Sequence, residues 1–236
     1  MLPAESPAIR RGRLTDDEMM HHAADPHPAE TMKKFTAIHC LVLLSLSITI
    51  QSAAYGYGYA KEEDPLIKVF KAVIFYGRQA NWEKVSREVN SISDRIADVY
   101  AIFKIDLRPE INHAIQKQDF QSLTNHMANL VFFAIREKFY YNIQENLTVY
   151  VRSKVRLGLA EEYYLTLLAG NVRNYDARHK TTLHEDIYRR FVRARGTLGS
   201  AGFFGAGAIP PDVKEFERIT KEIENLLFLA FPYFKA

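Results

Sequence analysis

The chain has 236 residues, and its 31 Lys and Arg against 28 Asp and Glu give a formal net charge of +3. This charge is too small to indicate a nucleic-acid-binding protein, which usually carries a strongly basic face. The single cysteine, Cys40, lies in an apolar segment that we expect to be removed, which excludes disulfides, cysteine-ligated metals and covalent c-type haem from the mature chain.

Residues 1–31 contain four prolines, charges of both signs and few large apolar side chains. Such a composition cannot bury a core. We therefore expect a disordered extension, or one that is not translated because Met32 is the true start.

Residues 32–54 have the three parts of a secretory signal peptide: two lysines, an apolar run over 35–50, and small residues at Ser52 and Ala54. Cleavage is expected before Tyr55, with a second possible site at Gly58 and Ala60. The apolar run has 16 residues, whereas a membrane-spanning helix needs roughly 18 or more. The sequence therefore predicts a periplasmic or secreted protein, which would be membrane-anchored if residues 35–54 were not cleaved.

Residues 55–63 alternate Tyr and Gly at first and predict a flexible leader, followed by a single helical domain over residues 64–236. Asp64 and Pro65 predict the start of a helix that ends near Gly77 or Gln79. Asn81 predicts the cap of one long helix, whose apolar stripe continues to Phe103.

Pro109 predicts a short helix through about Gln116, and Asp119 predicts the cap of the next. The latter helix is apolar on nearly every side over residues 131–135. A helix of this kind belongs at the centre of a bundle.

A further helix is expected from about Glu145 to Ala169, ended by Gly170. Residues 182 and 185 have the spacing of a capping box and predict a helix that ends at Gly196. Residues 212 and 215 repeat this spacing and predict the last helix. No long segment alternates with the period of a strand, so the predicted fold is an all-α antiparallel bundle of about six or seven helices.

An internal similarity links residues 81–92 with 119–130, which follow 38 residues later, and with 215–226. Each segment has a polar residue, an aromatic residue, and aliphatic residues at helical spacing. With the residues before them, the first two resemble the turn between the helices of a tetratricopeptide repeat. The chain departs from that family because large residues, Val73, Val85, Ile111 and Leu123, stand where it has small ones. A simple bundle is the favoured prediction, and a true repeat is the alternative.

Glu110 and His113 form a Glu-x-x-His pair, as in di-iron helical bundles. Such a site needs a second pair, and the nearest, Asp176 with His179, has a different acid and is expected in a loop. His126 and Met127 are adjacent on one helix and cannot both reach one haem iron. No cofactor is predicted.

Arg193 and Arg195 belong to a basic helix that could bind an anion or a phospholipid headgroup. The alternative is ordinary surface pairing, Glu185 with Arg189 and Asp186 with Arg190, and a favourable interaction of the last arginines with the helix dipole.

Residues 196–211 hold five glycines, Phe203, Phe204 and no charge. This loop is longer than a connection needs. We expect either a contact loop for a partner protein or a membrane surface, or a loop held over the bundle end by its two phenylalanines.

No nucleophile and base can be identified together, so the sequence does not predict an enzyme. The favoured function is an exported helical protein that binds a partner protein or supports an assembly in the periplasm. The alternative is a bundle that binds a small ligand, haem or metal. Trp82, Phe120 and Phe216 each begin an apolar stripe and are expected to be buried.

Overall fold

The computed structural model describes residues 62–202 and 207–235. These residues all belong to one compact unit, Glu62–Ala236. The predicted extension, the signal peptide, most of the leader, Phe203 and Phe204 lie outside the described residues.

The described residues are helical and contain no β-strand. The all-α prediction is confirmed. The elements in chain order are α2 (Pro65–Arg78), α3 (Trp82–Asn90), α4 (Ser93–Phe103), α5 (Arg108–Gln116), α6 (Phe120–Gln144), α7 (Tyr150–Tyr163), the π-helical stretch η1 (Tyr164–Leu168), α8 (Ala169–His179), α9 (Leu183–Gly196) and α10 (Val213–Ala230).

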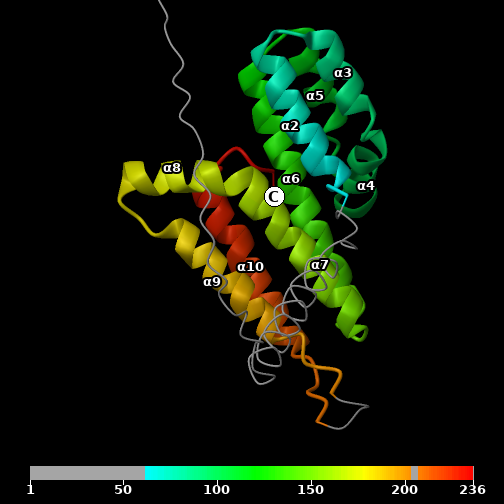
Figure 1. Cartoon of the computed structure of the whole chain (residues 1–236), viewed down its shortest axis with the longest axis vertical. Helices are drawn as coiled ribbons and strands as arrows, with labels where there is room; N and C mark the ends of the chain where they lie inside the picture. The colour runs from blue at the N-terminus through cyan, green and yellow to red at the C-terminus, as the bar shows by residue number, and fades with distance from the viewer. Residues whose placement is uncertain (1–61, 203–206, 236) are drawn as a thin grey trace, which may run out of the picture. The chain divides into compact units, whose positions relative to one another are not determined.

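Helix α6 is the centre of the unit, as its apolar sequence predicted. It contacts α2, α4, α5, α7, η1 and α10. In Figure 1 the helices α2, α3 and α5 gather around one end of α6, while α8, α9 and α10 lie below and to the left of them. Every residue from Met127 to Ile135 is buried, because neighbours cover all sides of this helix.

The first two hairpins, α2–α3 and α5–α6, have equivalent turns. Ala80 and Gln118 both have positive φ, 54° and 55°. The next residue in each turn donates its backbone N–H to a carbonyl five residues earlier, Asn81 to Tyr76 and Asp119 to Ala114. Each then caps the following helix with its side chain. The similarity at a spacing of 38 residues is therefore a similarity of backbone geometry, a Schellman turn followed by a side-chain cap.

The long helix expected from Asn81 to Phe103 is interrupted, and this prediction is wrong. α3 ends at Asn90, and α4 begins at Ser93. Ser91 donates its hydroxyl to the carbonyl of Glu88 at 2.6 Å, and the amide of Ile92 bonds to Val89, only three residues back. This tighter turn still leaves Ile92 buried, so the apolar stripe reaches the core on both sides of the break.

Gly170 does not end a helix, contrary to the prediction. The chain continues from α7 through η1 into α8, which ends at His179, and Lys180 has the positive φ of 55° that follows the helix end. Gly170 lies near the start of α8 and is exposed. A glycine can end a helix but does not have to, because it also adopts helical φ.

Asp176 caps α9 in place of the predicted capping box. Its carboxylate accepts hydrogen bonds from the backbone amides of Leu183 at 2.7 Å and His184 at 2.9 Å. Thr182 makes no side-chain cap. Asp176 belongs to α8 (Ala169–His179) and not to the expected loop. Its hydrogen bonds connect α8 to the start of α9.

The C-terminal residues after α10 fold back onto the centre of the unit. Phe234 stacks on Phe132 of α6, with ring centroids 4.9 Å apart, and on Phe231 at 4.6 Å. Lys235 donates its backbone amide to Asn129 at 3.3 Å and pairs through Nζ with Glu110 of α5 at 2.5 Å. The tail thus joins α5 and α6 to the end of α10.

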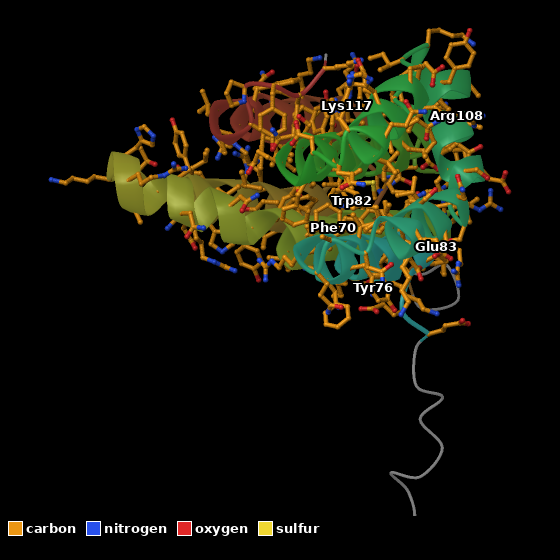
Figure 2. All side chains as sticks on the ribbon, turned by 90° about the horizontal axis from the view of Figure 1, so that it is seen from above. Phe70, Tyr76, Trp82, Glu83, Arg108 and Lys117 are labelled. Atoms are coloured by element: carbon orange, nitrogen blue, oxygen red, sulfur yellow. The ribbon has the colours of Figure 1, made fainter. Side chains whose placement is uncertain are left out.

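The three aromatic residues expected to be buried differ in their environment. Phe216 is fully buried, whereas Trp82 and Phe120 are half-buried. In Figure 2 Phe70 and Trp82 lie on the side of α2 and α3 that faces the green helices. The prediction is therefore confirmed only for Phe216.

Within the part of the chain that the structure describes, no helix combines the length and the apolar character that crossing a bilayer requires.

Candidate functional site

A groove of about 700 Å³ runs along one face of α10, beside α6 and the end of α4. Its floor is formed by apolar and aromatic side chains, and its rim by charged residues of α10. The α10 residues that line it recur at helical spacing, Lys214, Glu217, Arg218, Lys221, Glu224 and Asn225 among them. The lined stretch, from 214 to 225, corresponds to about 16 Å of helix at 1.5 Å per residue.

Arg136 lies at the inner wall of this groove among aromatic rings. Its guanidinium carbon is 5.0 Å from the ring centroid of Phe103, 5.5 Å from Phe132 and 5.4 Å from Phe133. Cations over aromatic faces are stabilised by the negative potential of the ring, more strongly when water is excluded. The rings therefore hold the guanidinium at a fixed place in the groove.

Glu224 of α10 is the charged partner of Arg136. Its Oε2 lies 3.3 Å from Nε of Arg136, and the two side chains are only 12% and 19% exposed. Burial raises the pKa of Glu224, although Arg136 and Lys221 act in the opposite direction. The attraction of Arg136 and Lys221 therefore does not fully offset the cost of removing the Glu224 carboxylate from water.

Charged residues of both signs pair along the rim and join α9 to α10. Arg218 makes a bidentate contact with Glu215, at 2.7 and 2.6 Å, and also pairs with Glu222. Glu222 in turn accepts from Nε of Arg190 on α9 at 2.9 Å. The rim is therefore an organised network of charges.

The predicted anion-binding arginines lie on α9 and have carboxylate partners. Arg193 contacts Glu215 at 3.1 Å, and Arg195 pairs with Glu161 of α7. The expected pair of Glu185 with Arg189 is present at 2.9 Å. The structure thus directs Arg193 and Arg195 towards two different helices and does not bring them together in one site.

Arg190 forms its expected pair with Asp186 and has a second, closer carboxylate partner. It is 4.0 Å from the carboxylate of Asp186 but 2.9 Å from that of Glu222. The contact with α10 is the closer one because the helices pack along this side.

The expected contact residues Phe203 and Phe204 lie outside the described residues. On either side of them, Ser200 and Ile209 form an isolated bridge, with backbone bonds of 2.9 and 3.1 Å. Gly199 has a φ of +73°, and a Cβ there would lie 2.3 Å from the carbonyl oxygen of Ile209. The two sides of the loop therefore approach closely at Gly199.

Glu110 and His113 are not brought together with further metal ligands. Glu110 pairs with Lys235, and His113 is exposed on α5. No cluster of three or more His, Cys, Asp or Glu residues suited to a metal ion occurs within residues 62–202 and 207–235. His126 lies near Glu110 and Lys235. Burial lowers the pKa of His126, while the negative charge of Glu110 opposes this shift.

Sequence reasoning did not identify the groove, because its parts come from α4, α6 and α10. One signal was present: Arg136 directly follows the apolar residues 131–135. A charged residue next to such a segment must either reach solvent or find partners.

The chain matches no family model. Neither a curated protein nor a solved structure matches it.

Proposed function

We propose that this chain is an exported, non-catalytic binding protein that holds a segment of a partner protein in the groove between α6 and α10. The observation that carries the proposal is the arrangement of the groove, with Arg136 and aromatic rings at its centre and paired charges of both signs around it. Interfaces between proteins have this anatomy, an aromatic and arginine-rich centre within a polar rim.

The shape of the groove supports a helical segment of the partner. The lining residues follow one face of α10, so a second helix could lie alongside it with apolar side chains directed at Phe103, Phe139 and Ile143. Binding of an amphipathic helix in an apolar groove is a recurring mode of recognition. The rim acids and bases would select a partner with charges of both signs.

A small ligand is the second candidate, because the groove volume of about 700 Å³ is within the roughly 300–1,000 Å³ of common ligand sites. Arg136 would then receive an anionic group that displaces Glu224. A metal or haem function has no comparable observation in its favour.

Photocrosslinking in the source cells tests the proposal. A benzophenone amino acid replaces Lys221, whose side chain is 67% exposed at the rim, and Lys68, exposed on α2, serves as the control. We expect a discrete protein adduct from position 221 and none from position 68. When Tyr140→Ser is added to the protein that carries the crosslinker at position 221, the yield of the adduct should fall, since Tyr140 lines the groove.

Equal adducts from both positions, or none from position 221, would contradict the proposal. Native mass spectrometry of the purified protein distinguishes the second candidate. A bound small molecule that is lost in the Arg136→Leu variant would favour it over a partner protein.

A further inference from the structure

A second groove, of about 570 Å³, lies between the start of α6, one face of α8 and the C-terminal tail. Four carboxamide side chains line it: Gln121 and Asn125 from α6, and Asn171 and Asn174 from α8. None of the described residues that line this groove carries a carboxylate. It is separate from the groove between α6 and α10 and shares no lining residue with it.

The carboxamides on α6 are oriented by each other. Nε2 of Gln121 donates to Oδ1 of Asn125 at 3.1 Å. This leaves the oxygen of Gln121 as an acceptor and the nitrogen of Asn125 as a donor. One wall therefore presents a donor and an acceptor side by side.

The tail supplies an aromatic ring with a fixed orientation. Tyr233 packs edge-on against Phe231 at 6.1 Å and against Phe234 at 5.3 Å, and remains 42% exposed. Burial raises the pKa of Tyr233 to about 12, so the phenol is a neutral hydrogen-bond donor at physiological pH. The ring offers an apolar surface next to the carboxamides.

The lining excludes several ligand classes. With no carboxylate among the described residues that line it, the groove lacks the charged oxygen ligands that Ca²⁺ and Mg²⁺ sites in proteins usually include. Arg178 is the only cation among its described lining residues, and it donates Nε to the backbone carbonyl of Asn174 at 3.2 Å. One arginine is too little for a nucleic acid backbone. A purely apolar ligand would displace water from the carboxamides without replacing its hydrogen bonds.

We propose that this groove binds an oligosaccharide that carries acetamido groups. Each sugar ring has many hydroxyls that both donate and accept, as carboxamides do, and an acetamido group matches a carboxamide with one donor and one acceptor. The apolar face of a sugar ring would lie on Tyr233. Arg178 would face the outer end of the groove, where it could contact an acidic substituent.

NMR titration of the ¹⁵N-labelled domain with tri-N-acetylchitotriose tests this proposal. We expect saturable shifts of the side-chain amide signals of Asn125, Asn171 and Asn174, with unchanged signals for Asn225 in the other groove. Asn174→Ala and Tyr233→Ala should each raise Kd at least tenfold. The control, Asn112→Ala, changes an exposed carboxamide of α5 and should leave Kd unchanged.

The matched sugar cellotriose has the same linkage without acetamido groups and should bind at least tenfold more weakly. Absence of shifts at 10 mM tri-N-acetylchitotriose, shifts confined to other surfaces, or equal binding of both sugars would overturn the proposal. Tyr233→Phe keeps the ring and its packing, so it should retain most of the affinity even where Tyr233→Ala destabilises the tail.

Discussion

Gly77 and Gly170 both lie within helices, but only Gly77 has to be a glycine. A Cβ at Gly77 would lie 2.5 Å from the ring of Phe120, at the turn of another hairpin, whereas a Cβ at Gly170 would meet nothing within 4 Å. Sequence reasoning gave Gly170 the role of ending a helix and treated Gly77 only as a possible end. It could not distinguish them, because the neighbour that matters is 43 residues away in the chain.

Alanine substitutions at the two glycines should therefore have opposite effects. Gly77→Ala is expected to lower the free energy of unfolding by about 1–3 kcal/mol through overpacking. Gly170→Ala should raise it by about 0.5–1 kcal/mol, because alanine loses less backbone entropy in a helix. Urea denaturation followed by circular dichroism measures both, and a destabilised Gly170→Ala would show that this end of α8 has contacts we have missed.

At the scale of helices, the caps show which predictions a local pattern supports. Asp64, Asn81, Asp119 and Asp212 accept backbone amides of the helices that follow them, as predicted. Each of these caps depends on neighbours in sequence. The bounds of α9 agree with the prediction, but its capping interaction was predicted wrongly, because the carboxylate that accepts its first amides belongs to Asp176 of the preceding helix. The break after α3 was missed because the apolar stripe continues across it.

The groove is a feature of the same scale, since α6 supplies Arg136 and α10 supplies Glu224. Because the pKa of Glu224 is raised, the folded protein takes up this proton before the unfolded chain does. Protonation should therefore stabilise the fold as pH decreases towards the ordinary carboxyl value of 4.5. Glu145 and Glu215 have lowered pKa values, in each case owing first to a hydrogen bond from an arginine. Their protonation as pH decreases should therefore destabilise the fold.

Comparison with Glu224→Gln isolates this effect. The free energy of unfolding of the wild type minus that of the variant should rise between pH 7.5 and 4.5, since only the wild type gains the proton. Glu217→Gln, an exposed substitution on the same face of α10, is the matched control and should show no such rise. A constant difference for Glu224→Gln would mean that the carboxylate is better solvated or better paired than its burial indicates.

For the unit as a whole, the central place of α6 was predictable because its apolar residues cover every side of the helix. The all-α class followed from helical spacing and caps. The docking of the tail was not predictable, since Phe234 and Lys235 contact residues more than 100 positions earlier, and such pairings leave no local pattern. For the same reason the sequence did not identify the second groove, which needs α6, α8 and the tail together.

Phe216 and Trp82 test how the core is distributed over the unit. Phe216 is fully buried and lies 6.3 Å from Phe139 of α6, so Phe216→Ala should cost about 3–5 kcal/mol. Trp82→Ala should cost less, because half-burial removes less apolar surface from water. Each kcal/mol of lost stability lowers the Tm of a chain of this size by about 2–4 °C, so thermal melts would distinguish the two variants. Equal losses would place Trp82 in the core as firmly as Phe216.

The docked tail also constrains when the fold can be completed. The contact of Lys235 with Glu110 joins residues 125 positions apart, so it can form only after Lys235 has been synthesised. A ribosome that still holds Phe234 and Lys235 would leave Phe132 without the ring that stacks on it. Packing of the tail against α5 and α6 should therefore be a late step of folding, completed only once residues 234 and 235 have left the ribosome.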